Sequence, residues 1–218
     1  MEYAHHRKFM VDGQLRPNKV TDPGILAGMG RLPREAFVPA AHRARAYADA
    51  DVPLLNGRAM MQPMMLARLV QALAVRLGEA ALVVGAASGY SAALLADLGA
   101  SVTALEADPV LLAAARMALP GAVPGSQPVL AEGPLAEGWA ASAPYRVILV
   151  DGAVQALPDS LTAQLAEGGR LATIIAPPGR MPHAVLLRRI GGALDNTVLF
   201  DASAPNLPGF AREAAFSL

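Results

Sequence analysis

The chain has no cysteine, few aromatic residues (5%) and little charge (17% of its residues). Without cysteine it can form no disulfide, no thiolate nucleophile and no cysteine-ligated zinc site. Its 18 basic residues balance 18 acidic ones, so the net charge gives no attraction to nucleic acid or to anionic lipid. We therefore expect neither a nucleic-acid partner nor a membrane partner, although these counts leave room for a local charged patch.

The chain also lacks a signal peptide and a convincing membrane span. Residues 1–8 contain no apolar core of the signal-peptide kind. The apolar stretch Ala80–Ala96 has about the minimum length that spans a bilayer, and Gly85 and Gly89 interrupt it, which favours a strand followed by a turn and a helix. The four histidines have no ligand-spaced partners, so no metal site is predicted. Together these absences predict a cytoplasmic protein.

What the sequence does contain, from about residue 80 onward, is an alternation of short apolar runs with helical patterns. This alternation is typical of a parallel sheet with crossover helices. The predicted strands lie at residues 81–84, 101–105, 128–131, 146–150 and 170–175, with an antiparallel pair at 185–190 and 197–201. The predicted helices lie at 91–98, 109–119 and 157–165; a loop is expected at 120–128, and Gly168-Gly169 is expected to stop the last helix.

The first 75 residues differ, because prolines divide them into short helices predicted at 4–12, 23–31 and 40–47. An amphipathic helix at 64–76 then leads into the sheet. We expect residues 1–75 to form a helical cap over the carboxyl edge of the sheet, in one compact unit with residues 76–218. The predicted fold class is α/β: a Rossmann-like, doubly wound, mostly parallel seven-stranded sheet with a helical N-terminal cap and an antiparallel C-terminal strand pair.

A ligand site is predicted where the first strand of the sheet turns into its helix. In doubly wound sheets ligands bind beyond the carboxyl ends of the strands near this point. The turn, Gly85–Tyr90, has glycines that let a ligand approach the backbone, and the next strand ends in Glu106, which can accept ribose hydroxyls. The Gly-x-x-x-Gly spacing favours an adenosine-bearing ligand over a dinucleotide. The alternative is a tight turn that binds nothing.

Two blocks in the N-terminal region carry a family resemblance. Residues 10–17, MVDGQLRP, and 30–39, GRLPREAFVP, resemble protein-L-isoaspartate O-methyltransferases, and residues 46–49, 62–63, 85–90, 145–149 and 167–171 continue the resemblance in order. It implies a transferase that uses S-adenosyl-L-methionine, bound by an α/β domain at 76–218, to methylate isoaspartyl carboxylates in protein repair. Its substrates would be proteins or peptides that carry isoaspartate.

The resemblance also implies site positions. Those expected to bind the cofactor are Gly85, Ala86, Ser88, Gly89, Tyr90, Glu106, Ala107, Glu132, Gly133 and Asp151. Those expected to act on the substrate lie in the loop 57–63, at Arg58, Met61 and Gln62. Asp151 either lines the pocket or caps the turn that follows its strand.

The chain departs from the family in both loops. The family's substrate loop reads roughly Gly-Gln-Thr-Ile-Ser-Gln-Pro, whereas residues 57–63 read GRAMMQP, so Ala59 and Met61 replace two hydroxyl side chains. In the cofactor turn, Val83 replaces an acid and Ala87 replaces a glycine. If the backbone at Ala87 has positive φ, the alanine is strained by about 1–3 kcal/mol. Arg58 could supply the lost donor by pairing with a carboxylate, or it could be a solvated loop arginine.

Two functions follow from these matches and departures. The first is an S-adenosylmethionine-dependent methyltransferase that acts on isoaspartyl carboxylates. The alternative is a non-catalytic relative with weakened or lost cofactor and substrate binding, acting as a binding or regulatory protein. The sequence predicts no oligomeric state and no role for the residues after Asp201.

Overall fold

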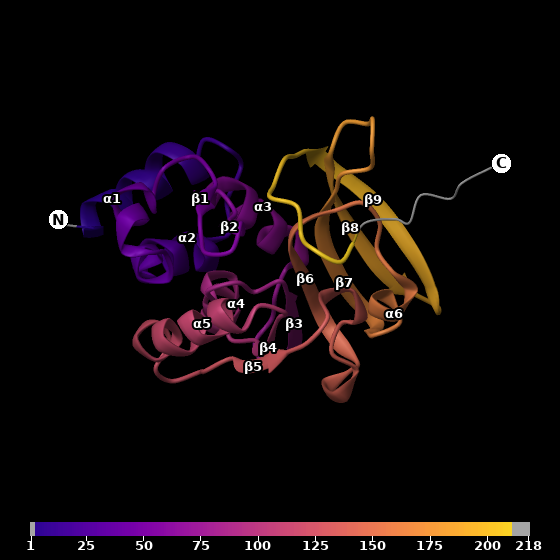
Figure 1. The fold of residues 1–218 in the computed structure, drawn as a ribbon. Coiled ribbons are helices and arrows are strands. Elements are labelled where there is room, and N and C mark those ends of the chain that lie inside the picture. The colour runs from indigo at the N-terminus through magenta and orange to yellow at the C-terminus, as the bar shows by residue number, and fades with distance from the viewer. Residues whose placement is uncertain (1–2, 211–218) are drawn as a thin grey trace.

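The computed structural model, which describes residues 3–210, is built around a seven-stranded sheet in the order β5-β4-β3-β6-β7-β8-β9 (Figure 1). The strands from β5 to β7 pair in parallel. β8 pairs antiparallel with β7, and β9 pairs antiparallel with β8. The bounds are β3 Ala80–Val84, β4 Ser101–Glu106, β5 Val129–Glu132, β6 Tyr145–Val154, β7 Leu165–Ile175, β8 His183–Ile190 and β9 Ala193–Asp201. The predicted fold class is confirmed.

Helices cover the sheet, and the N-terminal ones gather on one side of it (Figure 1). Their bounds are α1 Tyr3–Met10, α2 Pro23–Arg31, α3 Pro63–Leu73, α4 Tyr90–Asp97, α5 Pro109–Ala122 and α6 Asp159–Thr162. A π-helical turn, Val11–Leu15, extends α1, and two 3-10 turns lie at Arg34–Phe37 and Ala40–Arg45. None of the helices within residues 3–210 has the length and apolar character needed to cross a bilayer.

The sheet separates two hydrophobic clusters, one on each face. Met10, Leu15 and Met29 from the N-terminal helices lie in the same cluster as Val83 and Leu149 from the sheet. The N-terminal helices therefore share a core with one face of the sheet. The division of the chain at residue 75 stays a prediction.

Capping residues begin the helices where the sequence predicts. Asp22 accepts a hydrogen bond from the Ile25 backbone N–H at 2.9 Å, with a proline as the first helical residue of α2. Asp108 does the same for α5, accepting from the Val110 N–H at 2.8 Å and the Leu111 N–H at 3.4 Å.

The predicted helix 157–165 with its Gly-Gly stop is wrong. Only the single turn of α6 is helical there, and Gly168 and Gly169 lie inside β7. The ladder between β6 and β7 shifts register beside them. A side chain at Gly169 would come within 3.0 Å of the Tyr145 carbonyl, so the glycine pair forms an irregularity within the strand and does not end a helix.

The loop predicted to begin at Pro120 is also wrong, because α5 runs through Pro120 to Ala122. Proline removes one backbone donor, but here it lies in the last turn of the helix. The following bond, from the Val123 N–H to the Leu119 carbonyl at 2.9 Å, is still made. Leu119 is buried and holds this last turn on the core.

Strand β6 continues beyond the residue where the sequence predicts its end. The pairing of β3 with β6 ends at Val150. Beyond that residue, the segment that follows β9 pairs with β6 in place of β3. The Ala153 N–H donates to the Pro205 carbonyl at 2.8 Å, and the Leu207 N–H donates to the Ala153 carbonyl at 2.9 Å. We call residues 205–207 the return segment; it lies at the switch point between β3 and β6.

Candidate active site

The glycine turn after β3 has the backbone that the sequence predicts. Gly85 and Gly89 have φ angles of 76° and 98°, in the region that favours glycine. Ala87, between them, also has positive φ, at 49°, so the predicted strain at this position is present. The turn is tightly covered: a Cβ at Gly85 would lie 2.8 Å from the Leu207 side chain and 3.3 Å from Arg58 Nη2.

Replacing Gly85 with alanine is expected to lower the free energy of unfolding by about 2–4 kcal/mol. About 1–2 kcal/mol comes from the left-handed backbone, and the rest comes from overpacking against Leu207. Gly78→Ala is the matched control, because φ there is 78° and no atom lies within 4 Å of the added methyl. Chemical denaturation of both variants measures the two losses of stability. If Gly85→Ala and Gly78→Ala lower the free energy of unfolding equally, the return segment shifts to accommodate the added methyl group without cost.

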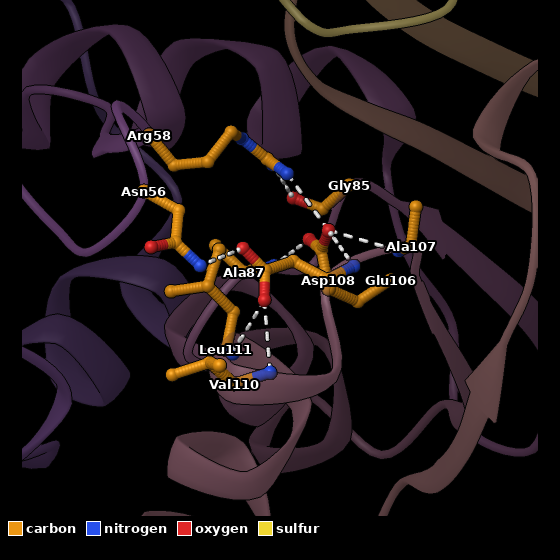
Figure 2. Close-up of polar contacts among 9 residues, drawn as sticks. All are labelled: Asn56, Arg58, Gly85, Ala87, Glu106, Ala107, Asp108, Val110 and Leu111. Atoms are coloured by element: carbon orange, nitrogen blue, oxygen red, sulfur yellow. Dashed lines mark hydrogen bonds and ion pairs between the residues drawn. The ribbon is translucent and has the colours of Figure 1, made fainter.

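Glu106, at the end of β4, is the centre of the site (Figure 2). Its side chain is fully buried. Oε2 accepts the Ala87 N–H at 2.7 Å, and Oε1 accepts the N–H groups of Ala107 at 2.9 Å and Asp108 at 3.1 Å. The acid that the sequence places at this position is therefore fixed by the backbone of the glycine turn and of its own strand end.

Arg58 completes the surroundings of Glu106. Its Nη1 lies 2.7 Å from Glu106 Oε1, and its Nη2 donates to the Gly85 carbonyl at 3.2 Å. Only 8% of the Arg58 side chain is exposed, so the interpretation of Arg58 as a solvated loop arginine is wrong. The arginine of the predicted substrate loop reaches the cofactor side of the site.

Some of the remaining residues predicted to bind the cofactor are buried, and others are exposed. Ser88 Oγ donates to the Phe37 carbonyl at 2.5 Å, and the buried Tyr90 ring meets that of Phe37 edge to face at 5.5 Å. Ala86 is buried, whereas Ala107 and Glu132 are exposed, and the Gly133 N–H donates to the Glu106 carbonyl at 3.2 Å. Their roles toward a ligand stay predictions.

The substrate loop is anchored by two residues that the sequence analysis missed. Arg34, fully buried, donates from Nε to the Ala46 carbonyl at 2.6 Å and from Nη2 to the Met61 carbonyl. Asp51 accepts the Gln62 N–H at 2.9 Å. The Met61 side chain is buried in the core, so it is not exposed for contact with a substrate.

Asp151 lies in β6 just beyond the switch point, and its Oδ1 atom is buried. It lies two residues beyond Leu149, the partner of Val83, so along the strand its side chain is on the face that Val83 occupies. Burial raises the pKa of its carboxyl, although Ser91, Arg58 and Arg34 act in the opposite direction, and Oδ1 has no hydrogen-bond partner. Because β6 continues through this residue, Asp151 does not cap a turn.

Asp151→Asn is expected to make the protein more stable at neutral pH, because a neutral amide avoids the desolvation of a charged carboxylate. A carboxyl whose pKa is raised in the folded state favours folding most below its unfolded pKa, near 4. The wild type therefore loses stability as the pH rises from that value through the folded pKa, and the asparagine variant lacks this loss. Thermal unfolding of both proteins between pH 4 and 8 measures it; parallel curves would contradict the expectation.

The described structure leaves little room beside the turn. The pocket next to it, lined mainly by apolar residues that include Phe37, Leu54 and Leu111, has a volume of about 130 Å³. Pockets for ligands of drug size usually have about 300–1,000 Å³. Arg58 and Leu207 both lie over Gly85 of the glycine turn.

Comparison with known proteins indicates the family of the chain. The model of the protein-L-isoaspartate (D-aspartate) O-methyltransferase family matches residues 6–197. A protein-L-isoaspartate O-methyltransferase of Methylorubrum populi is 43% identical over 84% of this chain and 85% of its own length, and one of Methylorubrum extorquens is 40% identical over 85% and 81%.

A solved structure supports the same fold. It is described as a beta-aspartate methyltransferase from Plasmodium falciparum in complex with S-adenosyl-L-homocysteine. It has a TM-score of 0.77 and 20% identity, and the match covers 93% of this chain and 97% of that one. The family match and the two Methylorubrum relatives support the first of the two predicted functions, and none of the comparisons favours the non-catalytic alternative.

Proposed function

Because the chain belongs to the protein-L-isoaspartate O-methyltransferase family, we propose that it transfers a methyl group from S-adenosylmethionine to isoaspartyl carboxylates of damaged proteins. The observation that carries the proposal is a buried carboxylate, Glu106, beside a glycine turn, in a chain that matches the family over residues 6–197. The site contains no cysteine and needs none for this chemistry. We further propose that the protein works in the cytoplasm.

The residues of the turn suit the cofactor. Glu106 would accept the ribose hydroxyls, and the glycine at position 85 would let the cofactor approach the backbone. Glu132, exposed at the end of the adjacent strand β5, would lie toward the adenine. Asp151, on the other side of β3, has one buried carboxylate oxygen and would face the positively charged end of the cofactor.

The reaction needs little acid–base catalysis. Bound S-adenosylmethionine supplies a methyl group on a sulfonium: the carbon–sulfur bond breaks with its electron pair left on sulfur as the methyl carbon bonds to a carboxylate oxygen, and no proton moves. A carboxylate with a pKa near about 4 is already ionised at neutral pH. The residues of this chain therefore have to align the substrate and exclude water.

Calorimetric titration with S-adenosylmethionine and S-adenosylhomocysteine tests the first step, with binding expected for both. Methyl transfer is then measured to an isoaspartyl peptide, with the aspartyl peptide of the same sequence as the control. We expect methylation of the first peptide only. Failure to bind either ligand at about millimolar concentration would reject the proposal, and equal methylation of both peptides would reject the isoaspartyl specificity.

A further inference from the structure

Arg58 binds two groups that the proposed function assigns to the cofactor. They are the Glu106 carboxylate and the Gly85 carbonyl (Figure 2). Arg58 itself comes from the substrate loop, 48 residues earlier in the sequence than Glu106. One side chain thus joins the two halves of the site.

Donors crowd one oxygen of Glu106. Oε1 accepts the N–H groups of Ala107 and Asp108 and the guanidinium of Arg58, although a carboxylate oxygen has only two lone pairs. Oε2 accepts the Ala87 N–H. A ribose hydroxyl that binds Oε1 must therefore displace a donor, and Arg58 is the one donor of the three on Oε1 that can leave without a backbone movement at the strand end.

The tip of the loop that carries Arg58 is attached to the cofactor face by few side chains. Residues 54–58 form a turn closed by their own backbone, with bonds from the Leu54 N–H to the Arg58 carbonyl at 2.8 Å and from the Arg58 N–H to the Leu55 carbonyl at 3.1 Å. Besides Arg58, the side-chain tether of this tip to the cofactor face is Asn56, which donates to Asp108 Oδ2 at 2.6 Å. The base of the loop is held separately, by Arg34 and Asp51.

A released Arg58 would be the natural partner of a substrate carboxylate. Among residues 54–61 it has the one charged side chain, and the side chains at positions 59 and 61 have no hydrogen-bond donor. A guanidinium binds a carboxylate through two parallel hydrogen bonds. The same group that holds Glu106 can therefore hold an isoaspartyl carboxylate.

We propose that Arg58 exchanges carboxylate partners: it holds Glu106 when the cofactor is absent, is displaced when the cofactor binds, and then binds the substrate carboxylate. The inference rests on the proposed function, because it requires a cofactor at Glu106 and a carboxylate substrate. It makes binding ordered, with the cofactor first, and assigns the specificity for a carboxylate to a residue of this chain.

The test compares the wild type with Arg58→Gln by calorimetry, first with S-adenosylhomocysteine and then with an isoaspartyl peptide in its presence. Because the competitor for Glu106 is gone, Arg58→Gln should bind S-adenosylhomocysteine roughly tenfold or more tightly. Because the partner of the substrate is gone, it should bind the peptide roughly tenfold or more weakly. Arg43→Gln, at an exposed arginine outside the site, should change neither affinity.

The two effects have opposite signs, which a general loss of structure would not produce. If Arg58→Gln binds S-adenosylhomocysteine no more tightly than the wild type, Arg58 is not displaced and the exchange is rejected. If the peptide affinity is unchanged, Arg58 does not bind the substrate and the exchange is likewise rejected. If the wild type and Arg58→Gln both fail to bind S-adenosylhomocysteine, the proposed function is rejected as well. Failure of the exchange alone is distinguished from this outcome, because S-adenosylhomocysteine then still binds.

A measurement on the wild type alone keeps the inference testable if the variant does not fold. Hydrogen exchange of the amides of residues 54–58 should become faster when S-adenosylhomocysteine is added, because the loop loses its tether, and slower again when the isoaspartyl peptide is added. Slower exchange on adding S-adenosylhomocysteine alone would overturn the proposal.

Discussion

Replacing Arg34 with methionine is expected to lower the free energy of unfolding by about 3–5 kcal/mol, because each buried carbonyl left without a donor costs about 1–3 kcal/mol. The variant leaves the carbonyls of Ala46 and Met61 in the core without their donor. It also removes the guanidinium that lies 4.8 Å from the centre of the Tyr90 ring. For a domain of this size the melting temperature should fall by about 6–20 °C, as measured by calorimetry or circular dichroism.

Arg31→Met is the matched control for this variant. Arg31 pairs with Asp97, but 63% of its side chain is exposed, so its loss should cost at most about 1 kcal/mol. If the two variants lose equal stability, the buried bonds of Arg34 do not anchor the substrate loop in the way the structure indicates.

Glu106→Gln is expected to have an effect of similar size, about 3–5 kcal/mol. Both carboxylate oxygens accept backbone N–H groups, so one of them would face the amide NH₂ of the new side chain. Arg58 would also lose its charged partner in a nearly buried position. Denaturation of Glu106→Gln, Arg58→Gln and the double variant measures how strongly the two residues couple.

The double variant should be less destabilised than the sum of the two single ones, because each single variant already breaks the pair. Strictly additive losses would show that the ion pair contributes no coupling. Glu132→Gln provides the control, since Glu132 is exposed at the end of the neighbouring strand and its replacement should change stability by no more than about 0.5 kcal/mol.

Much of the fold can be predicted from the sequence because its signals are local. Apolar runs of strand length mark β3 and β4, and Asp followed by Pro marks the start of α2 and of α5. The errors arise where local signals have two meanings. Gly168-Gly169 suits both a helix stop and a bulged strand, and the pairing of β7 with β6 decides between them.

The site was predictable in part for the same reason. The positive φ of Ala87 and the place of Glu106 follow from the turn and the strand that contain them. The pairing of Arg58 with Glu106 joins residues 48 apart, and no local pattern indicates it. The role of Arg34 is equally non-local, because it depends on carbonyls 12 and 27 residues further along the chain.

The return segment makes the site depend on a part of the chain beyond the family match. It lies after residue 197, where the match to the family model ends, yet Leu207 covers the glycine turn of the site. Leu207 also lines a pocket of about 210 Å³, together with Asn206 and Phe210. A substitution at Leu207 would therefore change both the packing over Gly85 and the wall of this pocket.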